Sequence, residues 1–261
     1  MEHQRSGCLS AADHGPVRVL RMERPDAHNA LNATVLQRLD EELDRLAADR
    51  VRALVVTGAG RAFSAGADLT ELSGLDADEA AAVLSAGQRV FRRLERLPVA
   101  SVAAVNGAAL GGGFELALAC SFIVAGRRAS FGFPETALGL IPGYGGTQRL
   151  PRAVGLQLAR RMILTGERLR ADRAWELGIC AEPPVEDDAL VDHAVGLAGQ
   201  IARRGPQATA RALEALAAGA PADTNLDHEL ALAAMAAASR EAREGVSAFL
   251  EKREPDFEGV T

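Results

Sequence analysis

Two glutamates are candidate acid and base groups, because each is the only charged residue in a long apolar stretch. Glu115 is the single charge within residues 97–126, where it closely follows a run of three glycines. Glu135 is the single charge within residues 129–148. Burial of a carboxylate is costly and favours its protonated form, and such residues concentrate at functional sites. The alternative for either glutamate alone is a structural ion pair with an arginine that the fold brings close.

A glycine run beside Glu115 can supply main-chain N–H donors. Residues 111–113 are all glycine, and the sequence predicts that they open a helix. The first amides of a helix have no partner within it and lie at its positive end, so a negative oxygen could bind there. The same run could instead be a tight turn that needs glycine for its φ angles. Combined with two carboxylates, it predicts an oxyanion site beside a general acid and a general base, which suits proton chemistry through an enolate.

Other kinds of active site lack support in the sequence. The dinucleotide fingerprint needs a third glycine where Phe63 stands, and the serine-hydrolase elbow needs a glycine where Ala62 stands. The histidines, at positions 3, 14, 28, 193 and 228, show no metal-ligand spacing. We therefore predict neither a nucleotide-binding fold nor a serine nucleophile, and no metal site.

The composition is that of an ordinary soluble globular chain. Of its 261 residues, 48% are apolar and 25% charged, and the net charge of −6 argues against binding to nucleic acid or to an anionic membrane. The three cysteines are scattered, which favours inert thiols in a reducing compartment. No apolar signal segment is found near the N-terminus, so we expect a cytoplasmic protein.

The apolar residues 97–114 are long enough to raise the possibility of a membrane span. Pro98, Asn106 and four glycines interrupt them, and such residues suit a strand, a loop and a helix better than one continuous helix. We therefore expect no membrane association.

Strand and helix patterns alternate in the first half of the chain. Strands are predicted over residues 17–25, 51–60, 99–105 and 121–126, and helices over residues 32–50, 80–97 and 112–120. Asn32 is the predicted N-cap of the first helix. The chain becomes mostly helical after Gly146. This order predicts an α/β core over residues 1–204 and a helical C-terminal region over residues 205–261.

Four segments together resemble the crotonase superfamily, and within it the enoyl-CoA hydratases. They read RAFSAGADL, VNGAALGGGFELALAC, FGFPETALGLIPGYGGTQRLPRAVG and EGVSAFLEKREPDF, and the resemblance runs from residue 17 to residue 257. It implies a spiral core of repeated ββα turns and a helical C-terminal region that makes trimer contacts. It also implies a homotrimer or a homohexamer.

The resemblance assigns a role to each candidate site residue. The amides of Ala67 and Gly112 would form an oxyanion hole for a thioester carbonyl. Glu115 and Glu135 would hold one water between them, with Glu115 activating it for attack at C3 and Glu135 exchanging the proton at C2. The implied activity is reversible hydration of trans-2-enoyl-CoA to 3-hydroxyacyl-CoA, with coenzyme A as part of the substrate and no other cofactor.

The resemblance is weakest among the residues expected to contact coenzyme A. Residues expected to contact it are Ala27, Ala65, Asp68, Leu69 and Lys252, the last through a neighbouring subunit. Asp26 and Thr70 stand where family members commonly carry lysines, and Lys252 is the only lysine of the chain. Arginines could supply the missing charge, or the substrate could be carried by a protein instead of coenzyme A; we favour coenzyme A.

Three other functions fit the same resemblance. A crotonase-type dehydratase or double-bond isomerase of a biosynthetic pathway could use the same site. An RNA-binding relative is disfavoured by the acidic charge balance, and an inactive structural subunit is disfavoured by the presence of both glutamates.

Overall fold

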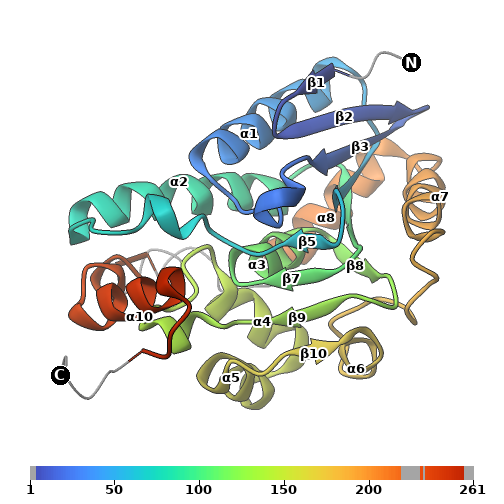
Figure 1. Ribbon diagram of the computed structural model, residues 1–261. Helices are drawn as coiled ribbons and strands as arrows, with labels where there is room; N and C mark the ends of the chain where they lie inside the picture. The colour runs from blue at the N-terminus through green and yellow to red at the C-terminus, as the bar shows by residue number, and fades with distance from the viewer. Residues whose placement is uncertain (1–3, 219–229, 232, 256–261) are drawn as a thin grey trace.

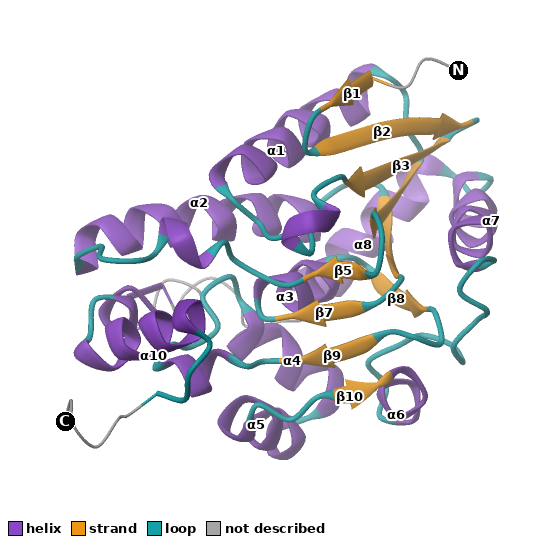
Figure 2. Cartoon of the chain, viewed as in Figure 1, coloured by secondary structure: helices purple, strands orange, loops and turns teal. Residues whose placement is uncertain are grey.

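The structure is a computed structural model, and it describes residues 4–218, 230–231 and 233–255. Its strands form two sheets, drawn in orange in Figure 2. The larger sheet has the strand order β1 (Gln4–Ser6), β2 (Leu9–His14), β3 (Val17–Met22), β4 (Ala53–Gly58), β6 (Ala100–Val105) and β8 (Phe122–Ala125). The smaller has the order β10 (Leu169–Arg170), β9 (Ser130–Gly132), β7 (Ala108–Leu110) and β5 (Ala62–Ser64).

The chain winds as a spiral in which each turn adds one strand to each sheet and then a helix. The first turn is β4, β5 and α2 (Ala77–Glu95), and the second is β6, β7 and α3 (Gly112–Ala119). The third is β8, β9 and α4 (Gly146–Val154). Strands β4, β6 and β8 are parallel, as are β5, β7 and β9. The repeated ββα turn that the resemblance implies is therefore confirmed (Figure 1).

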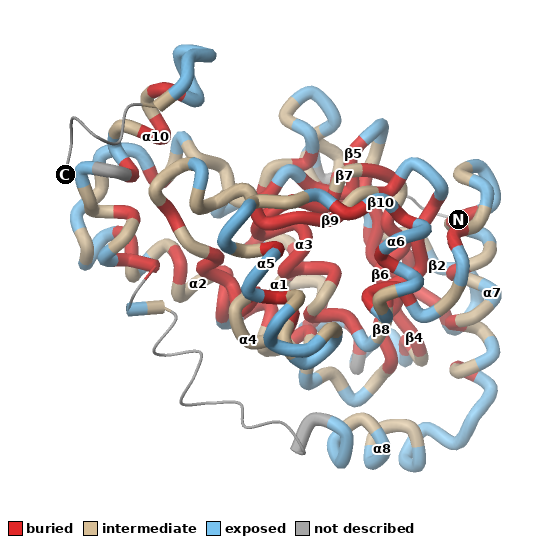
Figure 3. The backbone as a smooth tube through the Cα atoms, turned by 90° about the horizontal axis from the view of Figure 1, so that it is seen from below, coloured by how far each residue is buried: buried red, intermediate tan, exposed pale blue. Residues whose placement is uncertain are grey.

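The larger sheet is covered on both faces, which explains its continuous apolar strands. On β4, Leu54 and Val56 join the main core, whereas Ala53 and Val55 face the other way. That second face packs against α7 (Leu190–Ala202), which Figure 1 shows at the right edge of the molecule. Figure 3 shows the strands as the most continuously buried part of the chain. The apolar residues 97–114 are thus mainly strands β6 and β7 and the turn that follows them, and no helix in the described part of the chain has the length and hydropathy of a membrane span.

The sequence did not predict every strand. Strands β1 and β2 form an antiparallel hairpin before β3, and the short strands of the smaller sheet were missed as well. Strands β5, β7 and β9 have three residues each and β10 has two, which is too short for a hydrophobic period to be visible.

The remaining helices surround the sheets and close the C-terminal side. Those that can be given full bounds in the described residues are η1 (Pro25–Ala27), α1 (Ala33–Ala48), η2 (Leu69–Glu71), η3 (Glu135–Leu138), α5 (Leu156–Thr165), α6 (Ala171–Glu176), α8 (Pro206–Ala218) and α10 (Arg240–Glu251). Helix α10 packs on η3, since a Cβ placed on Gly245 would lie 2.3 Å from the carbonyl oxygen of Leu138. The division at residue 205 stays a prediction, because residues 219–229 and 256–261, with the last letters of the fourth resembling segment, lie outside the described residues.

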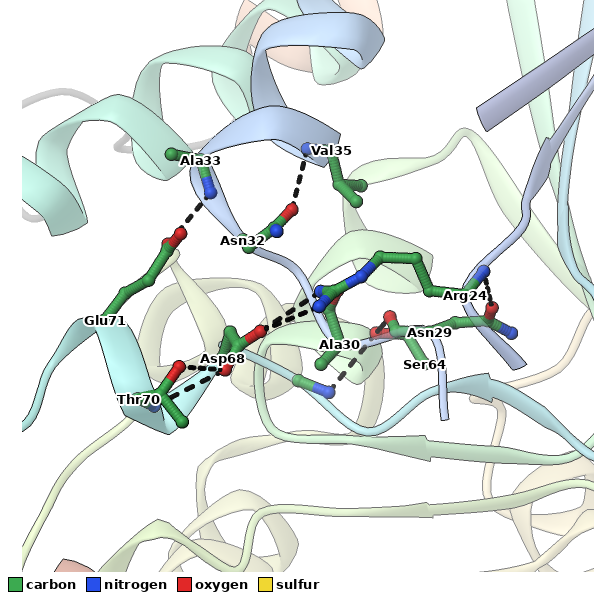
Figure 4. Close-up of polar contacts among 11 residues, drawn as sticks. Arg24, Asn29, Ala30, Asn32, Ala33, Val35, Ser64, Asp68, Thr70 and Glu71 are labelled. Carbon is green, nitrogen blue, oxygen red and sulfur yellow. Dashed lines mark hydrogen bonds and ion pairs between the residues drawn. The ribbon is translucent and has the colours of Figure 1, made fainter. Parts of the chain in front are cut away.

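The predicted N-cap of α1 is confirmed. Asn32 Oδ1 accepts a hydrogen bond from the amide of Val35 at 3.0 Å, as Figure 4 shows. The carboxylate of Glu71 accepts from the amide of Ala33 at 2.9 Å. Both bonds satisfy amides that the helix itself leaves without a partner.

Asn32→Ala should lower the free energy of unfolding by about 1 kcal/mol, because the amide of Val35 loses its acceptor. Urea denaturation followed by circular dichroism measures the change. Asn32→Asp is the matched control, since it keeps a side-chain oxygen at the same place. Its free energy of unfolding should stay within roughly 0.3 kcal/mol of the parent value. An unchanged urea midpoint for Asn32→Ala would contradict the assigned cap.

Candidate active site

Two turns meet at the edge where β5 and β7 end. The two strands are parallel, so the segments that follow them lie at the same edge of the smaller sheet. A Cβ placed on Gly66 would lie 3.1 Å from the amide nitrogen of Gly112 and 2.8 Å from the carbonyl oxygen of Leu110. A Cβ placed on Gly112 would lie 3.2 Å from the amide nitrogen of Ala67. The structure therefore brings the two predicted oxyanion donors, Ala67 and Gly112, together.

The local hydrogen bonds leave both amides directed away from their own elements. Leu31 donates to the carbonyl of Gly66 at 2.8 Å and accepts from the amide of Asp68 at 3.1 Å. In such a parallel bridge the N–H of the middle residue, Ala67, points to the opposite side. Gly112 is the first residue of α3, so its amide has no acceptor within the helix. These amides have the placement that a pair of oxyanion donors requires.

Glu115 is held by a loop from the far side of the site. The residue is only 1% exposed, and its Oε1 accepts from the amides of Tyr144, at 2.8 Å, and Gly146, at 2.7 Å. Gly146 allows this approach, because a Cβ there would lie 2.7 Å from the ring of Phe133 and 3.0 Å from Oε1 of Glu115. Two main-chain donors and the first turn of α3 both stabilise a carboxylate.

Glu135 lies against the same turn from another element. It is the first residue of η3, and a Cβ placed on Gly111 would lie 2.8 Å from its Oε1, while its Oε2 is buried. The carbonyl of Gly111 accepts from the amide of Glu115 at 2.9 Å. The two predicted acids and the two predicted amides are thus arranged around the single turn from β7 into α3.

A network beneath the Ala67 turn holds it in place, and of its members sequence reasoning singled out only Asp68, for contact with coenzyme A. Both terminal guanidinium nitrogens of Arg24 lie 3.1 Å from Oδ2 of Asp68, as Figure 4 shows. Asn29 Nδ2 donates to the carbonyl of Ala62 at 2.8 Å, and Ser64 Oγ donates to the carbonyl of Asn29 at 2.8 Å. The positive φ of Asn29, +56°, is a backbone feature that the sequence does not show.

Asp68 serves this network directly. Its partial burial opposes ionisation, but the hydrogen bonds from Thr70 and Arg24 outweigh burial and leave the pKa of Asp68 below its usual value. The carboxylate also caps η2, where it accepts from the amide of Thr70. Its visible role is to hold the turn that carries Ala67, and contact with coenzyme A stays a prediction.

The other predicted coenzyme A contacts lie at three places in the structure. The amide of the exposed Ala65 donates to the carbonyl of His28 at 2.9 Å, so this segment adjoins the η1 turn that contains Ala27. Leu69 is half-buried on η2 and packs against the core. Lys252 is exposed at the C-terminal end of α10, on a different element.

Neither thiol nucleophiles nor metal ligands gather in the described residues. Burial raises the pKa of the Cys120 and Cys180 thiols to about 12, so both are protonated at neutral pH and are poor nucleophiles. Within the same residues, no group of three or more His, Cys, Asp or Glu side chains could hold a metal ion.

Comparison with known proteins decides the family. Residues 13–260 match the family model described as enoyl-CoA hydratase/isomerase. The chain belongs to this family. It is 42% identical over 246 residues to 2,3-dehydroadipyl-CoA hydratase of Escherichia coli K12, covering 93% of this chain and 95% of the relative. It is 39% identical to crotonyl-CoA hydratase of Syntrophomonas wolfei, covering 92% and 93% of the two chains.

A solved structure agrees with this assignment. Enoyl-CoA hydratase from Bacillus anthracis superimposes with a TM-score of 0.78 at 37% identity, covering 96% of this chain and 99% of that one. The resemblance to the crotonase superfamily is therefore confirmed, together with the fold that it implies.

Gly66→Ala should destabilise the protein more than a substitution at a glycine with a similar φ but free surroundings. Gly66 has a φ of +102°, and the added methyl would also meet the carbonyl of Leu110. The clash adds roughly 1–3 kcal/mol to the backbone cost. Gly74→Ala is the control, because Gly74 has a φ of +78° with nothing within 4 Å, which leaves only a cost of about 1–2 kcal/mol. Urea denaturation compares them, and equal losses would contradict the close approach of the two turns.

Proposed function

We propose that this protein is an enoyl-CoA hydratase. It adds water reversibly to a trans-2-enoyl-CoA and forms a 3-hydroxyacyl-CoA. The observation that carries the proposal is the convergence of Glu115 and Glu135 on the turn whose Gly112 amide adjoins that of Ala67. The names of the relatives above, which describe hydratases of enoyl-CoA thioesters, support the same reaction.

The arrangement divides the reaction among four groups. The thioester carbonyl oxygen accepts hydrogen bonds from the amides of Ala67 and Gly112, which draws electrons from C3 and stabilises the enolate-like state. Glu115 takes a proton from water as the water oxygen bonds to C3, and Glu135 gives a proton to C2. The reverse sequence removes water, so the same site would also serve a dehydratase.

Hydration is favoured over double-bond isomerisation because two acids are present at the site. Moving a double bond needs one group that carries a proton from one carbon to another, whereas adding water needs one group for the water and one for the carbon. Both Glu115 and Glu135 are buried at least in part beside the donor turn. An isomerase or dehydratase of a biosynthetic pathway is the second candidate.

Glu115→Gln and Glu135→Gln should each lower kcat for crotonyl-CoA hydration by about 10²–10⁴-fold, because each removes an acid or base but keeps the side-chain shape. Loss of the conjugated enone absorbance measures the rate. Glu41→Gln, on the solvent side of α1, is a matched control whose rate should stay unchanged. Near-normal turnover by either active-site variant would show that its assigned role is wrong.

We propose coenzyme A, not a carrier protein, as the thioester group. The exposed Ala65 and the adjoining η1 turn form the surface where this group would bind. Arg24 cannot replace the missing lysines without giving up Asp68 and the carbonyl of Ala30, so other arginines would contact the phosphates.

Crotonyl-CoA should be hydrated with a higher kcat/KM than crotonyl-pantetheine, which lacks the adenosine phosphates. The difference should be about tenfold, which corresponds to about 1.4 kcal/mol of phosphate and adenine contacts. Initial rates on both thioesters and on a crotonyl carrier protein measure it at one ionic strength. Faster turnover of the carrier-linked substrate would favour the other thioester group.

We also propose that the chain assembles as a homotrimer or homohexamer in the cytoplasm, with residues 205–261 contributing contacts. The support is the exposure of large apolar side chains on the outer helices, which assembly would cover. They are Leu156, Leu164, Trp175, Leu216, Met235, Phe249 and Leu250.

A further inference from the structure

The loop that holds Glu115 is itself fastened to helix α2. The loop comprises residues 143–146, which follow η3 and run into the first residue of α4, and its amides at Tyr144 and Gly146 donate to Oε1 of Glu115. A shift of the loop would lengthen both bonds at once. Whatever fixes the loop therefore fixes the carboxylate.

Two successive residues in the middle of α2 make the first set of contacts that hold this loop. Gln88 is buried, and its Nε2 donates to the carbonyl of Gly143 at 3.1 Å. Beside it, Gly87 leaves room for the aromatic ring of the loop, because a Cβ at Gly87 would lie 2.4 Å from Tyr144. The ring of Phe91 meets that of Tyr144 edge-on at 5.3 Å. Helix α2 thus holds the loop both by a hydrogen bond and by close apolar packing against the ring of Tyr144.

The second fastening is a buried arginine. Arg149 is only 4% exposed, and its Nη1 donates to the carbonyl of Tyr144 at 2.6 Å. Its Nη2 and Nε lie 2.8 and 3.2 Å from Oε2 of Glu95, near the end of α2. A buried guanidinium is costly unless it is paired, and Glu95 supplies the counter-charge. Tyr144 is therefore held by Arg149 at its carbonyl while its amide holds Glu115.

We propose that Arg149, anchored by Glu95, is a positioning residue for Glu115. It does not touch the reacting atoms and acts through the Tyr144 peptide groups. The inference rests on the proposed function, because it assumes that Glu115 acts on the water. It adds to that function a residue that aligns the base, Glu115, without itself acting as the base.

Arg149→Met is the main test, with Arg152→Met as its matched control. Arg152 lies one helical turn from Arg149 and pairs with the other oxygen of Glu95 at 3.4 Å, but is far more exposed. Arg149→Met should lower kcat for crotonyl-CoA by about 10²-fold, the loss expected when a reacting group is displaced by about 1 Å. Its KM should change less than about threefold, since the donor turn at Gly66 and Gly112 is intact. Arg152→Met should match the parent protein in both constants.

A double-mutant cycle distinguishes positioning of Glu115 by Arg149 from a general loss of packing around the site. If Arg149 acts only through Glu115, Arg149→Met should cause no further loss in a Glu115→Gln background. Arg149→Lys, which keeps the charge but not the forked geometry, should recover part of kcat. If Arg149→Met does not fold, Gln88→Met releases the Gly143 end of the loop and should give the same fall in kcat. Circular dichroism and thermal unfolding report the folded fraction of each variant.

The outcomes distinguish this proposal from the function that it assumes. Parent-like kcat in folded Arg149→Met, or losses that multiply fully in the double variant, would overturn the positioning role even if Glu115→Gln is inactive. Parent-like kcat in Glu115→Gln would instead overturn the assignment of the base. A fall in kcat with non-additive losses supports the positioning role.

Discussion

The site depends on the close approach of two main-chain turns that leaves no room for a side chain. A Cβ placed on Gly113 would lie 2.2 Å from the carbonyl oxygen of Ser64, and one placed on Gly66 would lie 2.8 Å from that of Leu110. Main-chain amides can act as donors without the loss of side-chain conformational entropy that a side-chain donor would require. Their positions here are fixed by two paired strands. The glycines are thus required by contact between backbones, and the parallel pairing of β5 and β7 is what brings the backbones into contact.

A second constraint is the placement of charge in an apolar interior. The structure meets it for Glu115 with main-chain amides at 2.7 and 2.8 Å, and for Arg149 with Glu95 and a carbonyl. Amide donors carry no net charge, but their hydrogen bonds favour the ionised carboxylate, so they hold it in place without a buried cation beside it. The charged partner of Arg149 lies nearer the surface, since the side chain of Glu95 is 28% exposed.

The sequence predicted the two candidate acids better than the residues that hold them. Glu115 and Glu135 were visible because an isolated charge in an apolar stretch has no other signal to obscure it, and the N-cap Asn32 follows a local rule. The supports come from contacts between distant residues, such as Arg24 with Asp68, which no local pattern reveals. Strands β5, β7 and β9 were missed because their short runs are specified by pairing with neighbours and not by their own periodicity.

The two acids depend on different parts of the chain, and this follows from the spiral. Glu115 lies on α3, deep in the second ββα turn, and its loop is fastened to α2 of the turn before. Glu135 lies on η3, which is held by a hydrogen bond from Thr136 to the carbonyl of Ile163 on α5 and by contact with α10. Glu115 is thus held by elements of the spiral core, whereas Glu135 rests on α5 and α10. The amides of Ala67 and Gly112 are held separately, by the paired strands β5 and β7 and by the network around Asp68, so these two proposed donors do not rest on α5 or α10.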